Sequence, residues 1–142
     1  MSPLLPDRET VFFRNAAGSV IFHSAGYVEL AWRSSRIELG ELQAFYEQAL
    51  KLLQSTGSGR ILSVHGQRQP LSTAAQQWLT GDWIPRAIRQ AGFRHCAIVE
   101  GQDPVHRLST QGVVSSAPTT VEFRRFPHRA DAETWLTSQR AK

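Results

Sequence analysis

The residues best suited to acid–base chemistry follow two predicted strands. His65 closes the short apolar segment 60–65, and Glu100 and Asp103 come at the end of the next such segment, 94–100. The carboxyl ends of parallel strands meet at one edge of a sheet, where α/β folds place their ligands. Acid–base catalysis also needs a nucleophile, an oxyanion donor or a metal beside such groups. The spacing assembles none of these, so we assign no catalytic residue and expect no enzyme activity.

Metal, thiol and phosphate chemistry find little support in the sequence. The five histidines are dispersed, and His106 has no second ligand at helical spacing, so we expect neither a metal nor a cofactor. His95 and Cys96 are adjacent in a predicted strand and therefore point to opposite faces, which leaves Cys96 for the core. Gly57 and Gly59 follow a helix and precede a strand, the reverse of a phosphate-binding loop.

Segment 72–91 has a helical pattern that two tryptophans and a proline interrupt. Gly81 weakens the helix, and Pro85 removes a backbone donor and clashes with the preceding turn. We expect a kink or a break here. Asp82 is placed to cap a second helical segment whose first turn contains Pro85.

The two tryptophans of this segment have two interpretations. Trp78 and Trp83 lie five residues apart, about 140° around an ideal helix, and face one pocket only if the break reorients one of them. They belong either to the core or to a binding surface or apolar cleft. For the second case the candidate ligand or partner residues are Trp78, Asp82, Trp83, Ile84 and Arg86.

The elements that must position these residues alternate along most of the chain. Segments 11–14, 20–23 and 27–33 predict an antiparallel meander. A helix over 39–53, the strand 60–65, the helix 72–91, the strand 94–100 and a helix starting at 103–104 follow. A loop of small residues over 112–118, a strand over 119–126 and a closing helix over 130–139 complete the order. This predicts an α/β fold, with a mixed sheet of five to six strands covered by about four helices.

Composition limits the class of protein. The 142 residues, 41% hydrophobic, are typical of one domain, which we place at 10–142 after a leader at 1–9. The net charge of +4 is scattered rather than interleaved with aromatics, so nucleic acid is not an expected partner. One cysteine and no apolar run near the ~20 residues of a membrane span predict a cytoplasmic protein.

Four segments carry a resemblance to a known family: residues 76–78 (Gln-Gln-Trp), 82–87 (Asp-Trp-Ile-Pro-Arg-Ala), 95–99 and 132–136. With the order of elements, they resemble small bacterial STAS/SEC14-like proteins, which are related to the anti-anti-sigma-factor fold. The likeness covers about 10–139 and rests on structural motifs. It implies a STAS-like fold and regulation through protein contacts.

The resemblance also implies a phosphorylation site. In regulatory STAS proteins a serine at the start of a helix is phosphorylated, and Ser72 and Thr73 occupy the matching place here. The family's Asp-Ser-Ser/Gly-Leu-Gly type of sequence is absent from this loop. Free backbone amides and nearby Arg68 favour a phosphate there. The alternative is that Ser72 or Thr73 is an ordinary cap, with Thr73 and Gln76 forming a capping box.

Two functions follow as expectations. The first is a non-catalytic STAS-like domain that regulates through contacts with a protein partner or a second copy of itself. The second is a carrier or sensor of a small apolar ligand held under the kinked helix. An exposed apolar patch near Trp78 or Trp83 favours the first, and an apolar cavity favours the second.

Overall fold

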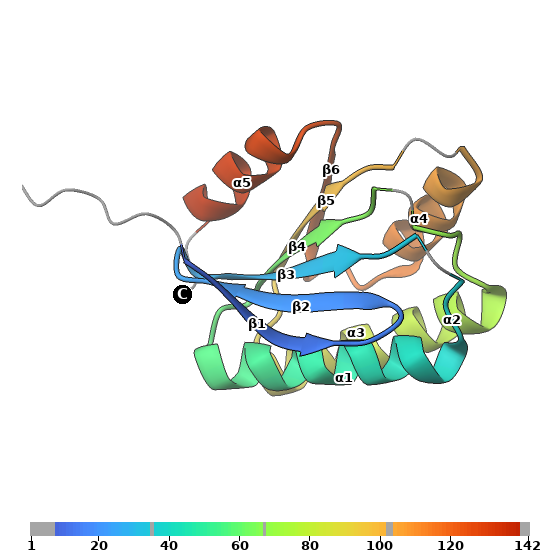
Figure 1. The fold of residues 1–142 in the computed structure, drawn as a ribbon, viewed down its shortest axis with the longest axis horizontal. Coiled ribbons are helices and arrows are strands. Elements are labelled where there is room, and N and C mark those ends of the chain that lie inside the picture. The colour runs from blue at the N-terminus through green and yellow to red at the C-terminus, as the bar shows by residue number, and fades with distance from the viewer. Residues whose placement is uncertain (1–7, 35, 67, 102–103, 140–142) are drawn as a thin grey trace, which may run out of the picture.

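The sheet of this protein has six strands in sequence order. The computed structural model describes residues 8–34, 36–66, 68–101 and 104–139. The strands are β1 (Glu9–Arg14), β2 (Gly18–His23), β3 (Tyr27–Trp32), β4 (Arg60–Val64), β5 (His95–Val99) and β6 (Glu122–Phe126). They lie side by side as β1-β2-β3-β4-β5-β6 (Figure 1). The expected mixed α/β sheet is confirmed.

The sheet changes direction at β3. Strands β1, β2 and β3 pair antiparallel, and β3 to β6 pair parallel. The first strand already begins at Glu9, the last residue of the expected leader, and residues 1–7 of that leader lie outside the described residues. The meander predicted from three short strands is therefore present, and its first strand starts two residues earlier than expected.

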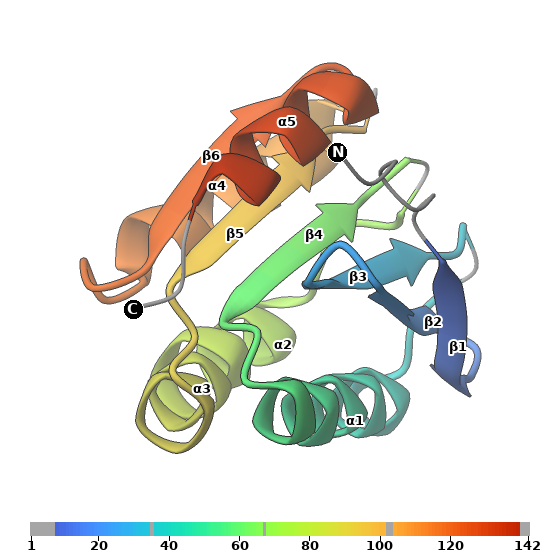
Figure 2. The ribbon, with the colours of Figure 1, turned by 90° about the vertical axis from the view of Figure 1, so that its left-hand side faces the viewer.

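Helices cover both faces of the sheet. They are α1 (Leu39–Thr56), α2 (Thr73–Trp78), the π-helical turn η1 (Leu79–Trp83), α3 (Ile84–Ala91), α4 (Pro104–Ser116) and α5 (Arg129–Ser138). Figure 2 shows α1, α2 and α3 on one face and α5 on the other. Helix α4 contacts α2 and η1. The three connections between the parallel strands run through α1, through α2 to α3, and through α4. Right-handed crossovers place these three connections on the same face of the sheet.

The alternation of side chains along the strands divides the core in two. Val28, Leu30 and Trp32 of β3 face α1 and the larger core. The smaller core lies under α5 and consists of Tyr27, Leu62, Ala97, Ala132 and Leu136. His95 and Cys96 point to opposite faces as predicted, since the His95 ring contacts Trp135 of α5 and Cys96 is buried in the larger core.

Helix ends agree with the sequence pattern in one case and differ in another. Helix α1 ends at Gly57, which is left-handed with φ 66° and donates its N–H to the Leu53 carbonyl. Helix α4 continues to Ser116, so the loop expected over 112–118 is wrong. Val113 is buried in the larger core, and this burial stabilises a helix that the small residues of the segment favour only weakly.

Candidate ligand-binding cavity

Helices α2 and α3 form one bent helix joined by the π-turn. The Ile84 N–H donates to the Leu79 carbonyl, five residues back. Pro85 has no N–H, and a proline ring clashes with the carbonyl four residues back in a regular helix, which the wider turn relieves. The predicted kink is thus a π-bulge. The cap predicted at Asp82 is not formed, because Asp82 lies inside the π-turn and its carboxylate instead accepts from Arg86 Nε at 3.3 Å.

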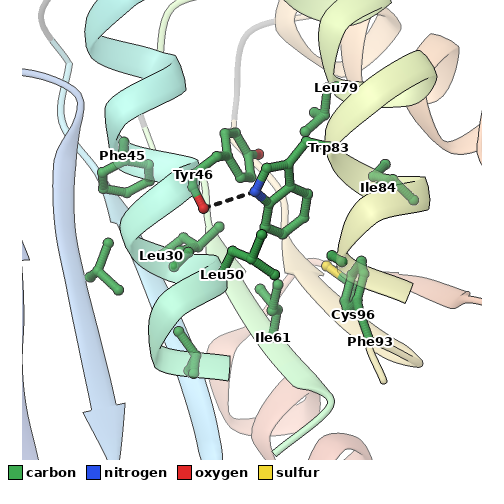
Figure 3. Packing of buried hydrophobic residues seen from close by; sticks show 14 of the residues in the cluster. Leu30, Phe45, Tyr46, Leu50, Ile61, Leu79, Trp83, Ile84, Phe93 and Cys96 are labelled. Atoms are coloured by element: carbon green, nitrogen blue, oxygen red, sulfur yellow. Dashed lines mark hydrogen bonds between the residues drawn. The ribbon is translucent and has the colours of Figure 1, made fainter. Parts of the chain in front are cut away.

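The bulge turns Trp83 into the core. Its side chain is 1% exposed, and its indole N–H donates to the Tyr46 carbonyl of α1 at 2.8 Å (Figure 3). The Tyr46 ring lies 4.8 Å from the Trp83 ring and 6.1 Å from the half-buried Trp78 ring, measured between centroids. Both tryptophans therefore contact the same tyrosine, although an ideal helix would separate them.

A cavity of about 50 Å³ lies between the bent helix, α4 and the sheet. Leu79, Trp83 and Ile84 of the bent helix form one wall. Ile61 and Ile98 of the two central parallel strands form the opposite wall. Figure 3 shows the bent-helix residues facing Ile61 across this part of the core. Most of the wall is apolar.

One end of the cavity is polar. Ser63 of β4 and His65, just past the end of that strand, line it together with Arg68 and with Thr110 of α4. Ser63 Oγ accepts from the Trp32 indole N–H at 2.9 Å and lies 3.0 Å from His65 Nε2. Arg68 Nη2 is 3.5 Å from Thr110 Oγ1. This end lies where the carboxyl ends of the parallel strands meet, the usual ligand position in α/β folds.

Arg68 brings a positive charge into this buried place. Its side chain is 4% exposed, and its guanidinium lies 4.6 Å from the centroid of the Trp32 ring. Burial lowers the pKa of Arg68 to about 10, so the group remains protonated near neutral pH. Burial also raises the pKa of Tyr46, against the opposing charge and hydrogen bond of Arg68.

Cys96 also lines the cavity, as an uncharged thiol. Burial raises its pKa to about 12, although the charge of Arg68 acts in the opposite direction. Because the thiolate is the nucleophilic form, this cysteine is chemically inert in the folded protein. The prediction that Cys96 belongs to the core is confirmed by its 5% exposure.

The predicted acid–base residues have different partners. His65 is buried at the polar end of the cavity. The Glu100 carboxylate lies 2.5 Å from Arg125 Nε and 3.1 Å from Arg107 Nε. Asp103 lies outside the described residues. The structure thus assigns His65 to the cavity and Glu100 to an arginine pair.

The predicted partner surface is divided by the bulge. Trp83 and Ile84 are buried and do not contribute to an exposed surface. Asp82 is exposed, and Arg86 Nη2 lies 2.5 Å from Glu47 Oε2 of α1. The outer side of the turn is therefore polar, and its apolar side chains face the cavity.

Ser72 and Thr73 are both exposed at the start of α2. Ser72 is the N-cap, and its Oγ accepts from the Ala75 N–H at 3.1 Å. The side-chain amide of Gln76 donates to the Leu71 carbonyl at 3.0 Å, so the capping box expected between Thr73 and Gln76 is not formed. Arg68, expected near a phosphate here, is buried against Trp32.

A second polar cluster lies on the opposite face, beneath α5. One ligand atom each from Glu9, His23 and Glu29 falls within 4.8 Å of the others, a spacing that suits a metal. The buried Glu29 carboxylate, however, accepts from Arg129 at 2.6 and 3.1 Å and lies 2.6 Å from His23 Nε2. A cation would have to displace the guanidinium, so this cluster is an ion-pair network that joins α5 to the sheet.

Sequence reasoning named His65 at this edge of the sheet but missed Ser63, Arg68 and Thr110 as its neighbours in the cavity wall. Ile61 and Ser63 of β4 and His65 just past its end stand at alternate positions and so share one face, a signal that the sequence does contain. The burial of Arg68 had no such signal, because its segment is polar and irregular. Its side chain contacts Thr110 of α4, Tyr46 of α1 and Trp32 of β3, all far away in the sequence.

The fold and the cavity define the class of protein: a mixed α/β domain whose bent helix covers a cavity with one cationic, polar end. Comparison of the chain with protein-family models, with curated proteins and with solved structures found no match. The STAS/SEC14-like resemblance stays a prediction. Among the described residues, no helix combines the length and apolar character that crossing a membrane requires.

Proposed function

We propose that this protein binds a small, largely apolar molecule in the cavity and acts as its sensor or carrier. The observation that carries the proposal is the cavity of about 50 Å³ beneath the bent helix. Protein interiors are close-packed and hold few voids larger than a water molecule. Apolar walls with a few placed polar groups are the usual composition of a ligand site.

The π-bulge supports a role in sensing. Such bulges occur frequently at functional sites. Leu79 and Trp83 of this bulge line the cavity, while Asp82 between them is exposed and contacts Arg86. A ligand that contacts the inner side of the bulge thus contacts a turn whose outer side is at the protein surface. This arrangement gives ligand binding a direct route to a change in surface shape.

The volume limits the size of the ligand. An engineered cavity of about 150 Å³ holds one benzene molecule. A cavity of about 50 Å³ therefore suits a molecule of only a few non-hydrogen atoms. Lipids and nucleotides are too large for it.

A thermal-shift screen tests the proposal. Compounds of up to about four non-hydrogen atoms, added at millimolar concentration, should raise the Tm because they bind only the folded state. Val113→Phe places a ring in the cavity wall and should abolish the shift, with Val113→Leu as a milder change. Val105→Phe on the same helix is the matched control, because Val105 is 60% exposed. The proposal fails if no compound raises the Tm of the wild-type protein more than it raises the Tm of Val113→Phe.

Regulation through protein contacts is a second candidate. Val105 and Leu108 of α4 are 60% and 73% exposed, and apolar side chains of this size at a surface favour association. If two copies associate through α4, light scattering should show a dimer that Leu108→Glu converts to a monomer. An unchanged mass in the variant contradicts that assembly.

Phosphorylation of Ser72 or Thr73 would support the same regulatory role. Mass spectrometry of the protein from its own host tests for it, because a phosphate adds about 80 Da.

A further inference from the structure

The wall of the cavity is thinnest between α4 and β6. Among the described residues that line the cavity, all but two are buried. The two exceptions are Val114 of α4 and Phe123 of β6, which are both half-buried. We call the boundary between α4 and β6 at these two residues the seam. A ligand can reach a cavity with such a wall only if part of the wall moves.

Phe123 connects the seam to the interior of the cavity. In the parallel pairing of β5 and β6, Phe123 is the register partner of Cys96, and Arg125 is the register partner of Ile98. These two pairs stand two residues apart and so lie on the same face of the sheet. Cys96 and Ile98 both line the cavity. Separation of α4 from β6 would therefore expose the cavity and the Cys96 thiol together.

Arg125 links the two sides of the seam. Its Nη1 donates to Gln111 Oε1 of α4, and its Nη2 lies 3.4 Å from the Arg107 carbonyl of the same helix. The Glu100 carboxylate, just past β5, lies 2.5 Å from Arg125 Nε and 3.1 Å from Arg107 Nε. The Arg125 side chain is 26% exposed, so solvent only partly screens these interactions. They tie α4 to the carboxyl ends of β5 and β6.

Helix α4 is the wall of the cavity with the smallest buried surface. Among its described side chains, only Thr110 and Val113 are buried, and Leu108 is 73% exposed. The bent helix on the other side is anchored by Trp83, which is buried and hydrogen-bonded to α1. Segments that bury few apolar side chains open locally at a lower free energy than the whole molecule unfolds. The polar links of Arg125 then contribute a large share of what holds α4 in place.

We propose that the cavity opens at the seam through a movement of α4, and that Arg125 holds the seam closed. This inference rests on the proposed function for its purpose, since the opening is the route by which the small ligand enters. It adds the position of the entrance and the residue that controls it. The opening itself is a property of the free protein and can be measured without a ligand.

The rate at which Cys96 is labelled measures the opening. Cys96 is the only cysteine of the chain and is buried, so a thiol reagent reacts with it only when an opening exposes it. The wild-type protein is treated with methyl methanethiosulfonate at about pH 8, and mass spectrometry follows the adduct. The rate should depend only weakly on urea at low concentration, because a local opening exposes little surface. A dependence equal to that of global unfolding overturns the inference.

Two neighbouring arginines of β6 provide a matched pair of variants. Arg125→Gln should accelerate labelling at low urea roughly three- to tenfold, because it removes the charged hydrogen bonds across the seam. Arg124→Gln removes the same charge, but the Arg124 guanidinium lies over Trp135 of α5, on the other side of the sheet. This control should be labelled within about twofold of the wild-type rate.

A third variant keeps the test valid if Arg125→Gln does not fold. Gln111→Ala removes the partner of Arg125 on α4, and its exposed position leaves the core intact. It should also accelerate labelling at low urea. Circular dichroism checks the fold of each variant, and urea unfolding gives the rate expected from global unfolding alone.

The outcomes separate this inference from the proposed function. If Arg125→Gln leaves the rate unchanged, or Arg124→Gln raises it equally, the role of Arg125 is overturned. If labelling requires global unfolding, the opening is overturned, while the thermal shifts still test ligand binding. If the seam opens as expected but no compound raises the Tm of the wild type more than that of Val113→Phe, the proposed function fails and the opening stands.

Discussion

Buried polar residues control the chemistry of both faces of this sheet. On the α1 side, Arg68 and Cys96 share a cavity in which burial lowers the pKa of the cation and raises that of the thiol. On the α5 side, Glu29 is 3% exposed and is held by Arg129. The first arrangement places a cation at the wall of a cavity, and the second holds a carboxylate inside an ion pair. The proposed ligand site therefore lies on the α1 side.

Ionisation of the Cys96 thiol makes the free energy of unfolding depend on pH in the alkaline range. Its pKa rises from 9.0 in the unfolded chain to about 12 in the folded protein, so above pH 9 the unfolded state loses a proton that the folded state keeps. The unfolded state then binds fewer protons, and stability falls as pH rises. Urea unfolding should show a loss of about 1.4 kcal/mol between about pH 8 and pH 10 from this group.

Cys96→Ala provides the control for that measurement. It should abolish this part of the pH dependence, whatever it does to stability at neutral pH. Above pH 10 the ionisation of Tyr46 in the unfolded state adds to the loss, because burial also raises its pKa in the folded protein. Equal losses in the wild type and Cys96→Ala below pH 10 would contradict the assignment to Cys96.

At the scale of elements, the bent helix decides what the cavity can hold. One wide turn replaces the break that Gly81 and Pro85 predict, and it keeps α2 and α3 continuous. Trp83 then reaches Tyr46 of α1 with a hydrogen bond of 2.8 Å. The bulge thus fixes the wall of the cavity through a specific contact with a neighbouring helix.

Alanine substitution at Gly81 tests whether glycine there only lowers helix propensity or is required by the backbone conformation of the π-turn. A Cβ there meets no atom within 4 Å, so Gly81→Ala should stabilise the protein by about 0.5 to 1 kcal/mol through the lower entropy of the unfolded chain. Gly57→Ala also has open space but a φ of 66°, and it should cost about 1 to 2 kcal/mol. Chemical denaturation measures both. Destabilisation by Gly81→Ala would show that the π-turn itself requires glycine.

At the scale of the whole molecule, the sheet protects its two edges differently. The outer strand β1 has a register shift between Val11 and Phe13, and such a bulge twists an edge away from pairing. The other edge, β6, carries Arg124 and Arg125. Charge and a bulge are both devices that limit pairing of sheet edges between molecules.

The two cores should differ in local stability. Helix α5 covers the smaller core with Ala132 and Leu136, and few buried apolar contacts favour local opening. Hydrogen exchange should therefore show faster exchange in α5 than in β4 and β5. Leu136→Ala should accelerate exchange in α5 most, whereas Leu53→Ala in the larger core should lower protection throughout, each by about 2 to 5 kcal/mol at the affected amides. Uniform protection across the molecule would contradict separate opening of α5.

The sequence by itself determined the order of elements and the two faces of the central strands. Alternation along β3 and the apolar stripe of α1 are local patterns with fixed periods, so they predict which side chains share a face. The Ser72 cap and the left-handed end at Gly57 are local as well. Such features depend on a few neighbouring residues, and the structure confirms them.

The tertiary structure alone decided where the chemistry lies. Trp83 became a cavity wall because a π-turn relieved the clash at Pro85. Arg68 became buried against Trp32 of β3, Tyr46 of α1 and Thr110 of α4. The length of α4 likewise depends on the burial of Val113. Each of these outcomes is set by contacts between segments far apart in the chain, which no local period encodes.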